Sequence, residues 1–384
     1  MSNKLLLKDT YFKALNSVKA KNIVKNNISL KNSKLIIKNE KIDLNKIANL
    51  YIYSVGKAGY DMAKECENIL GDNIKEGVAI SHKSGKLKYI KHITSTHPLV
   101  SNKSIKAADK LIKSLSSLKK DDYFIFFLSG GASAMIEKPA NDMSLKEFKK
   151  LSSKLLKSGI DITQLNKKRK ENSDIKGGKL ANLTKAKGIT LVLSDVIGDD
   201  LNTIGSAPMN NGKIPHHIIG NNKIALKNAK KFISKKIKNT KIGTTTLDKN
   251  SKKATKEISS LIKKYNKKYN RFCLLLGGET TTKVKGNGKG GRNQELALRL
   301  LLELKANKKL SLLCAGSDGI DGNSPATGAF IDHQLYKKCK KKNLNPKKYL
   351  KNSDSYTFFN KLGYDFTIGA TGTNVMDFII ILKN

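Results

Sequence analysis

The segment 274–299, LLLGGETTTKVKGNGKGGRNQELALR, carries the pattern on which the fold assignment rests. Its three leucines predict a short buried strand that ends at Gly277-Gly278-Glu279. Four glycines then fall within six positions, at 286, 288, 290 and 291, before a helical pattern begins at Arg292. Glycines let the backbone approach a ligand closely, and the first turn of a helix favours an anion. The order strand, glycine loop, helix therefore predicts an anion site, with a flexible hairpin tip as the alternative.

Arginine is rare in this chain, which makes Arg292 informative. Only four of the 74 basic residues are arginines: Arg169, Arg271, Arg292 and Arg299. A guanidinium group holds a phosphate or a carboxylate at two points, which an ammonium group cannot do. Because a positive charge at the start of a helix opposes the helix dipole, Arg292 needs a reason to be there. We expect Arg292 to make a two-point contact with a phosphate or carboxylate of a ligand.

The composition is that of a large globular protein with a strong basic bias. A chain of 384 residues with 39% hydrophobic content is long enough for two domains. The formal net charge is +43, but the lysines are spread over almost the whole chain and alternate with asparagine rather than with aromatic residues. A general lysine and asparagine bias explains this pattern more simply than nucleic-acid recognition. We therefore expect no specific nucleic-acid partner, and keep a basic nucleic-acid-binding protein as an alternative.

The cysteines and the hydropathy pattern predict a cytoplasmic protein without membrane association. The four cysteines show no paired spacing, and Cys273 and Cys314 lie in apolar strand-like segments, as buried thiols in a reducing compartment do. No apolar segment reaches the roughly 18 residues needed to span a bilayer. The leucines at 5–7 are too few for a signal sequence.

Apolar strands alternate with helices along most of the chain, which predicts an α/β protein. Strands are expected at 50–54, 77–81, 89–94, 122–128, 189–193 and 216–220, and helices at 60–70, 104–118 and 223–236. Strands that are apolar throughout and alternate with helices indicate a parallel sheet covered on both faces. A polar segment at 266–270 predicts a domain boundary close to these residues.

Small and polar residues follow the carboxyl ends of several predicted strands, where open α/β sheets bind ligands. Lys57 follows a glycine turn, and Ser129-Gly130-Gly131 offers successive N–H groups that can form a phosphate nest. Asp195 and Asp318 follow two other apolar strands, where a carboxylate can hold Mg²⁺ or accept a hydroxyl proton. Capping of the next helix is the alternative role for these aspartates. Together the features favour phosphoryl transfer.

The sequence patterns that are typical of several other kinds of enzyme are absent from this chain. The six histidines show no metal-ligand spacing, and His97, which precedes Pro98, is expected to be a turn residue. The chain has no Ser-x-x-Lys motif, no nucleophile elbow and no cysteine paired with a histidine, which disfavours covalent hydrolysis. The Walker phosphate loop and the nicotinamide fingerprint are also absent.

Nine motifs follow one another along the chain: Gly56-Lys57-Ala58, Thr96-His97-Pro98, Ser129-Gly130-Gly131-Ala132-Ser133-Ala134, Ile175-Lys176-Gly177-Gly178-Lys179-Leu180-Ala181, Ser194-Asp195-Val196-Ile197-Gly198-Asp199, Gly277-Gly278-Glu279-Thr280-Thr281, Gly290-Gly291-Arg292-Asn293-Gln294-Glu295, Asp318-Gly319-Ile320-Asp321-Gly322 and Thr371-Gly372-Thr373-Asn374-Val375. With these motifs in this order, the chain resembles the MOFRL-type glycerate 2-kinases from about residue 10 to its end.

The resemblance implies a larger Rossmann-like domain at 1–268, a smaller C-terminal α/β domain of the MOFRL type at 269–384, and an active site in the cleft between them. It implies that ATP, with Mg²⁺, phosphorylates the 2-hydroxyl group of D-glycerate. Some family members carry hydroxypyruvate reductase names, but the missing nicotinamide fingerprint argues against this oxidoreductase alternative. The oligomeric state stays open, with a homodimer as one option.

The same resemblance assigns roles to individual residues. The catalytic positions are Lys57, Asp195, Arg292 and Asp318, and the two aspartates are also the candidate metal ligands, with base and metal roles left undivided between them. The nucleotide-binding positions are Ser129, Gly130, Gly131, Gly277, Gly278, Glu279, Gly290, Gly291, Asn293, Thr373 and Asn374.

The chain departs from the family pattern at four places close to the predicted ligand loops. Glu171 stands where a histidine is usual, and Met376 where an asparagine is usual. Ser206-Ala207-Pro208 replaces Ser-Gly-Pro, and the segment 369–372 reads Gly-Ala-Thr-Gly instead of Gly-Pro-Thr-Gly. The reaction class is therefore better defined than the preferred acceptor.

Overall fold

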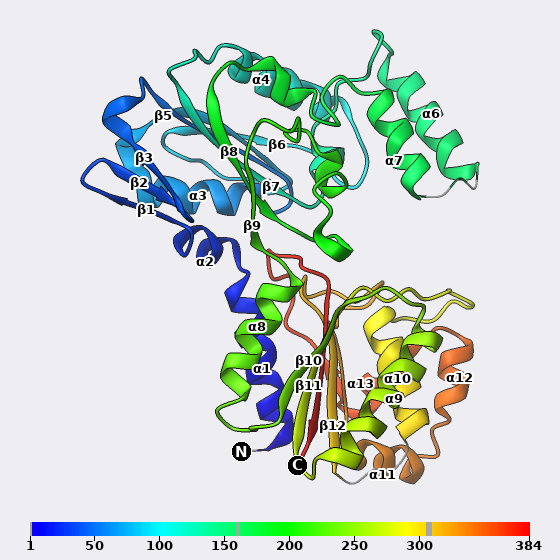
Figure 1. The fold of residues 1–384 in the computed structure, drawn as a ribbon. Helices are drawn as coiled ribbons and strands as arrows, with labels where there is room; N and C mark the ends of the chain where they lie inside the picture. Colours follow the sequence, from blue (N-terminus) through cyan, green and yellow to red (C-terminus); the bar gives the residue numbers. More distant parts are fainter. Residues whose placement is uncertain (1, 159, 161, 305–308) are drawn as a thin grey trace. The chain divides into compact units, whose positions relative to one another are not determined.

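The computed structural model describes residues 2–158, 160, 162–304 and 309–384 (Figure 1). Contacts between residues divide the chain into two compact units. We call residues 20–220 the continuous unit. We call the other the split unit, because it combines residues 1–19 with residues 221–384.

The continuous unit is built on a six-stranded sheet in the order β6-β5-β4-β7-β8-β9. All five strand pairs are parallel. The strand order changes direction between β4 and β7, and ligands bind open α/β sheets at this kind of switch point. The strands are β4 (Leu50–Val55), β5 (Ile74–Ser81), β6 (Ile90–Thr94), β7 (Tyr123–Ser129), β8 (Lys187–Leu193) and β9 (His216–Gly220).

Helices cover both faces of this sheet, as its apolar strands require. α3 (Gly59–Leu70) and α4 (Asn102–Ser116) lie on opposite faces (Figure 1). The α4 face carries Tyr53, whose hydroxyl group lies 3.0 Å from Ser114 Oγ, together with buried Phe124 and Phe126. The other elements of the unit are α2 (Ala20–Lys25), α5 (Ala132–Met135), α6 (Leu145–Lys157), α7 (Ile162–Glu171) and a three-stranded antiparallel sheet of β1 (Ile28–Lys31), β2 (Lys34–Ile37) and β3 (Glu40–Asp43).

The split unit contains a mixed six-stranded sheet in the order β10-β11-β15-β12-β13-β14. Only the β10–β11 pair in this order is parallel, and the other four pairs are antiparallel. The strands are β10 (Thr240–Leu247), β11 (Phe272–Gly278), β12 (Leu310–Gly316), β13 (Gly328–Ile331), β14 (Asp365–Phe366) and β15 (Asp377–Lys383).

The N-terminal helix belongs to the split unit although it lies far from the rest of it in sequence. α1 (Asn3–Ser17) packs beside α8 (Asn222–Ile233) on one side of the sheet, and α9 (Ser251–Lys268) and α10 (Arg292–Leu304) lie on the other side (Figure 1). The buried hydroxyl group of Tyr11 donates a 2.7 Å hydrogen bond to the carbonyl oxygen of Gly316, at the end of β12. The remaining helices are α11 (His333–Lys341), α12 (Pro346–Lys351) and α13 (Ser355–Leu362).

The predicted α/β class and the predicted parallel sheet are confirmed, but the contacts divide the chain at other positions than 268/269. That boundary falls between α9 and β11, inside the split unit. The physical reason is strand pairing, because β10 and β11 lie side by side in one sheet. The polar segment at 266–270 marks a solvated turn between two elements, and such a turn occurs within a domain as well as between domains.

The β1–β2 hairpin provides a test of backbone strain in the continuous unit. Asn32 and Ser33 form its two-residue turn, with φ values of 47° and 59°. Turns of this kind favour Asn-Gly, because glycine adopts positive φ without steric cost. We expect Ser33→Gly to raise the free energy of unfolding by about 0.5–1 kcal/mol in urea denaturation. The reciprocal change Gly212→Ala, at φ +78° with no atom within 4 Å of the added methyl group, should lower it by about 1 kcal/mol. The strain explanation would be contradicted if Ser33→Gly and the natural protein unfolded at the same urea concentration.

Candidate functional site

Three strand ends of the continuous unit bring Lys57, the 130–131 glycines and Asp195 together. The backbone N–H of Lys57, after β4, donates to the carbonyl oxygen of Gly130, after β7, at 2.9 Å. A Cβ atom on Gly130 would lie 1.8 Å from Asp195 Oδ2, and one on Gly131 would lie 3.1 Å from Lys57 Cγ. Glycine is therefore required at 130 because the Asp195 carboxyl group occupies the space of a Cβ atom, and it is favoured at 131 by a φ of +85°. The parallel sheet thus groups four of the predicted residues at its carboxyl edge.

The backbone after β7 offers unused hydrogen-bond donors at this edge. Among the described residues, the N–H groups of Gly130, Gly131 and Ala132 donate to no other group. Gly130 and Ala132 are buried, and buried N–H groups are rarely left unpaired. Ser129 instead shapes the neighbouring turn, because its Oγ accepts a 3.1 Å hydrogen bond from the N–H of Ala58. The arrangement of Gly130, Gly131 and Ala132 is that of a nest able to bind an anion.

Asp195 and Asp200 follow the same strand but have different environments. Burial raises the pKa of Asp195, and the ammonium group of Lys57 acts in the opposite direction. A carboxylate in this position is suited to accept a proton or to hold a cation. Asp200 is exposed and caps a local turn, because it accepts hydrogen bonds from the N–H of Asn202 at 2.9 Å and from Thr203 Oγ1 at 2.7 Å.

His97 also lies at this edge, although the sequence predicted only a turn residue there. A Cβ atom on Gly131 would lie 2.9 Å from His97 Cδ2 and 3.2 Å from His97 Nε2. The ring therefore packs over Gly131, next to the Lys57 side chain. The signal that could have identified His97 is its place three residues after the predicted strand at 89–94, since the carboxyl ends of parallel strands meet at one edge.

In the split unit, a carboxylate of the protein itself occupies the N-terminus of α10. Asp321 Oδ1 accepts from the N–H of Asn293 at 3.0 Å, and Oδ2 accepts from the N–H of Gln294 at 2.8 Å. A Cβ atom on Gly291 would lie 2.3 Å from Asp321 Oδ1, so glycine is required by this contact. The N-terminus of α10 is thus capped by Asp321, a carboxyl group of the protein itself, and a bound anion from outside the chain stays a prediction.

The two-point contact predicted for Arg292 is present, but its partner is Asp377. Arg292 Nε and Nη2 donate to Asp377 Oδ2 and Oδ1 at 2.7 and 2.9 Å, and Nη1 lies 2.8 Å from Glu279 Oε1. The Asp377 side chain is only 2% exposed. Burial alone would lower the pKa of Arg292, but the carboxylates of Asp377 and Glu279 outweigh it and raise that pKa. In the structure the guanidinium group is therefore bound by carboxylates of the protein, and its contact with a ligand stays a prediction.

Because Asp377 is buried, we expect Arg292→Lys to destabilise the protein. A lysine keeps the charge but loses one of the two charge-assisted hydrogen bonds, each worth about 1.5–3 kcal/mol. Urea denaturation should show a loss of that size in the free energy of unfolding. Arg271→Lys is the control, because the exposed side chain of Arg271 donates a 2.6 Å hydrogen bond to Asn384 Oδ1 and its replacement should change stability by less than about 0.5 kcal/mol. The account is wrong if both variants unfold at the same urea concentration.

Several other predicted nucleotide-binding residues have packing roles in the split unit. A Cβ atom on Gly277 would overlap the side chain of Asn222 at 1.8 Å, and one on Gly278 would meet the Leu247 backbone at 2.3 Å. Thr373 Oγ1 donates to the carbonyl oxygen of Val18 at 2.8 Å, and Asn374 Oδ1 accepts from the N–H of Met376 at 2.9 Å. These contacts account for the residue types without a ligand.

Asp318 and Asn293 lie near the Arg292–Asp377 pair. Asp318 is half-buried after β12, and its Oδ1 accepts a 3.3 Å hydrogen bond from the N–H of Ile320. A Cβ atom on Gly316 would lie 3.0 Å from Asp318 Oδ1 and 3.5 Å from both Asn293 Nδ2 and Asp377 Oδ1. Asn293 Nδ2 donates to Asp377 at 2.9 Å, whereas its Oδ1 is buried without a hydrogen-bond partner among the described residues.

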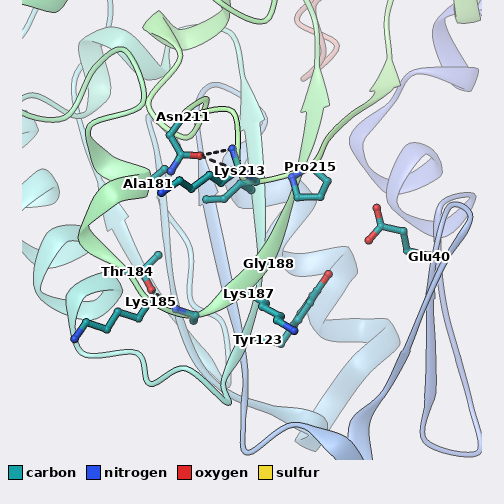
Figure 2. Close-up of a pocket in the computed structure, with 12 residues that line it drawn as sticks. Glu40, Tyr123, Ala181, Thr184, Lys185, Lys187, Gly188, Asn211, Lys213 and Pro215 are labelled. Atoms are coloured by element: carbon teal, nitrogen blue, oxygen red, sulfur yellow. Dashed lines mark hydrogen bonds between the residues drawn. The ribbon is translucent and has the colours of Figure 1, made fainter.

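A cavity of about 500 Å³ in the split unit is lined by Glu279, Gly290, Gly291 and Arg292, together with the threonines at 280–282. Four of the predicted positions thus share one cavity of a size typical for small ligands. In the continuous unit, a cavity of about 480 Å³ opens near Tyr123 and Lys187, where β7 and β8 begin (Figure 2). It lies at the edge of the sheet opposite to Lys57 and Asp195, so it is separate from their site.

The cysteines, the long helices and the possible metal ligands were also located in the part of the chain that the structure describes. Cys273 and Cys314 are buried, as predicted. No described helix is both long enough and apolar enough to cross a membrane. Within the same residues, no group of three or more histidine, cysteine, aspartate or glutamate side chains is arranged to hold a metal ion.

The departures from the family pattern have local structural consequences. Glu171, at the end of α7, forms an exposed ion pair with Lys168 at 3.0 Å. Ala207 adopts a left-handed backbone with φ 56°, and Met376 does so with φ 69°. Glycine and asparagine adopt this conformation more readily than alanine or methionine. The usual residues at 207 and 376 are therefore explained by backbone conformation.

Comparisons with known proteins cover both units. Residues 6–217 match a domain of unknown function, DUF4147, and residues 272–377 match the MOFRL family. A D-glycerate 2-kinase from Thermotoga maritima is 35% identical over 88% of this chain and 91% of its own length. A glycerate 2-kinase from Pyrococcus horikoshii is 31% identical over 94% of this chain and 92% of its length. The crystal structure of glycerate kinase from Thermotoga maritima superposes with a TM-score of 0.90 at 32% identity, over 99% of both chains.

Proposed function

The chain belongs to the DUF4147–MOFRL family of glycerate 2-kinases, and on that premise we propose that it transfers the terminal phosphoryl group of ATP to the 2-hydroxyl group of D-glycerate. The products are 2-phospho-D-glycerate and ADP. The structural observation that carries the proposal is the free N–H nest at 130–132 beside Lys57 and Asp195, at the switch point of the parallel sheet. Phosphoryl transfer depends on positioning and on stabilising charge, and this edge supplies groups for both.

Lys57 and the N–H groups of the nest have the same electrostatic role in this proposal. Negative charge on the non-bridging oxygens of the transferring phosphoryl group must be stabilised in the transition state. Fixed backbone donors provide this stabilisation without having to reorient, and Lys57 adds a full positive charge next to them. Arg292, with its fork largely held by Asp377 and Glu279, contributes its remaining N–H groups or fixes the surrounding loops.

Asp195 is the candidate to receive the hydroxyl proton of the acceptor. As the acceptor oxygen forms its bond to phosphorus, the bond to the ADP oxygen breaks and the hydroxyl proton must leave. Burial raises the pKa of Asp195, which makes its carboxylate a better proton acceptor than an exposed aspartate. Asp318 is the second carboxylate that could take this role, and the division of roles between them is part of the proposal.

The carboxylates also fit a magnesium ion bound together with ATP. Proteins usually hold Mg²⁺ in such complexes with one or two carboxylates, and phosphate oxygens and waters complete the octahedron. The oxygen-only donors of Asp195, in the continuous unit, and of Asp318, in the split unit, would each suit this ion, and the burial of Asp195 favours a compensating cation. When bound, Mg²⁺ would neutralise charge on the phosphate oxygens.

The direct test measures ADP release in a coupled assay with ATP, Mg²⁺ and D-glycerate, followed by phosphorus NMR of the product. We expect glycerate-dependent ADP and the resonance of the 2-phosphate ester. A 3-phosphate ester would overturn the assigned position, and an absence of glycerate-dependent ADP would overturn the activity. Oxidation of NADH or NADPH by hydroxypyruvate, without ADP release, would favour the reductase alternative.

A further inference from the structure

We propose that His97 is a ligand-binding residue and that its ring, Lys57 and the N–H groups of residues 130–132 form one oxyanion subsite. The ligand is an oxyanion, either the carboxylate of the hydroxy-acid acceptor or a phosphate group of the nucleotide. The inference rests on the proposed function, because it adds a residue to the same edge of the continuous unit.

The contact with Gly131 fixes where the ring lies. A Cβ atom on Gly131 would lie 3.2 Å from His97 Nε2 and 3.1 Å from Lys57 Cγ, so both side chains border the same glycine. Gly131 has a φ of +85°, and its own N–H group belongs to the nest. An oxyanion bound at the nest would therefore lie beside a ring nitrogen that can donate a hydrogen bond.

The His97 ring is available for such a bond. Neither of its nitrogens has a hydrogen-bond partner among the described residues, and the residue is exposed. His92, on the neighbouring strand β6, differs, because its Nε2 lies 3.0 Å from Ser81 Oγ and its Nδ1 lies 3.1 Å from the carbonyl oxygen of Gly85. The hydrogen-bonding capacity of His92 is used by the fold, whereas that of His97 remains free.

The charges around His97 also favour an anion. The Lys57 side chain borders the same glycine as the ring, and burial, Lys57 and His82, in that order, lower the pKa of His97. The nearest carboxylate of the cluster, Asp195, packs against Gly130 instead of Gly131. A neutral imidazole still offers one N–H donor, and a bound anion would offset the charge of Lys57.

Kinetics of His97→Gln test the role of the ring and the source of the oxyanion. Since the His97 ring makes no hydrogen bond with another described residue, the variant should unfold at the temperature of the natural protein. If the ligand group is the acceptor carboxylate, KM for D-glycerate should rise about tenfold while KM for ATP stays within twofold. If it is a phosphate of the nucleotide, KM for ATP should rise instead. The proposal is overturned if both constants, and kcat, stay within twofold.

His217→Gln is the matched control, because His217 lies in the same unit and its ring already bonds Glu40 at 2.9 Å. Its kinetic constants should not change. Both substitutions replace an imidazole ring with an amide. A change in kinetic constants that is found only in His97→Gln is therefore due to where His97 lies and not to the type of side chain.

A binding measurement separates failure of this subsite from failure of the proposed activity. The chain has six histidines, so the ring C–H resonances can be followed by NMR, and the His97 signal assigned by its loss in His97→Gln. Titration with inorganic phosphate and, separately, with D-glycerate should shift the His97 signal, and the signal of His217 should stay in place. A shift without kinase activity would uphold the subsite and reject the activity. An unshifted His97 signal with both ligands would reject the subsite.

Discussion

Lys57→Met is expected to lower kcat/KM for ATP-dependent phosphorylation of D-glycerate by about 10²- to 10³-fold, the cost of removing one preorganised charge-stabilising donor. The ammonium group would be lost from the edge where the 130–132 N–H groups and Asp195 meet. Lys57 Nζ donates no hydrogen bond to another described residue, so the free energy of unfolding should change by less than about 0.5 kcal/mol. Loss of activity without loss of stability is the expected signature of a residue that acts on the ligand.

Lys106→Met is the control for this substitution. Lys106 is exposed on α4, in the same unit, and removal of its charge alters the net charge of the chain by the same amount. Because the chain carries 74 basic residues, a general electrostatic effect on ATP binding would lower the activity of both variants alike. If Lys57→Met retains more than about a tenth of the natural activity, Lys57 is not the charge-stabilising group. The proposal that the phosphoryl group binds at the 130–132 N–H groups would then lose its main argument.

The grouping of several predicted residues at one edge of the continuous unit was predictable from the sequence, because parallel strands impose a simple rule. Any residue directly after a strand of such a sheet must lie at its carboxyl edge, whichever strands are neighbours. Lys57, Ser129 and Asp195 were found in this way. His97 was missed because the rule predicts which residues lie at the edge but not where their side chains point. Its position beside Lys57 is known only from its contact with Gly131 in the structure.

The partners in the split unit could not be predicted, because they are distant in sequence and carry no local signal. Arg292 was correctly singled out as a two-point donor, but Asp377 lies 85 positions further along the chain. Tyr11 and Gly316 are 305 positions apart, so nothing in the composition near residue 11 indicates that α1 packs with the C-terminal strands. Local patterns predict elements and their ends, whereas the pairing of buried charges depends on the assembled sheet.

Lys176→Met is expected to give the largest loss of stability, about 3–5 kcal/mol. Lys176 Nζ forms an ion pair with Glu137, and the two side chains are 4% and 0% exposed. Glu137 Oε1 also accepts a 2.6 Å hydrogen bond from Ser173 Oγ. Methionine fills a similar volume but leaves the Glu137 carboxylate buried without a compensating charge. Calorimetry should show a melting temperature lower by roughly 6–20 °C.

The surface pair Lys138–Asp109 is the matched control, since its side chains are 43% and 49% exposed at a similar place in the chain. Lys138→Met should cost less than about 1 kcal/mol, because solvent already screens that pair. The double variant Glu137→Gln with Lys176→Met removes both charges and keeps an acceptor for Ser173. It should recover at least about 2 kcal/mol of the loss. If the double variant is no more stable than Lys176→Met, the loss comes from packing and not from an uncompensated charge.

The Lys176–Glu137 pair also has a consequence for the ligand edge. The segment after Lys176 bonds the 206–207 turn, through Gly177 N–H to the Ser206 carbonyl at 2.9 Å and Gly178 N–H to the Ala207 carbonyl at 2.7 Å. Ser206 Oγ in turn donates to Ser133 Oγ at 2.9 Å, directly after the nest. Below the melting temperature of Lys176→Met, KM values should therefore rise more than they do for Lys138→Met at the same temperature. Unchanged KM values in the folded variant would show that the pair stabilises the unit without positioning the nest.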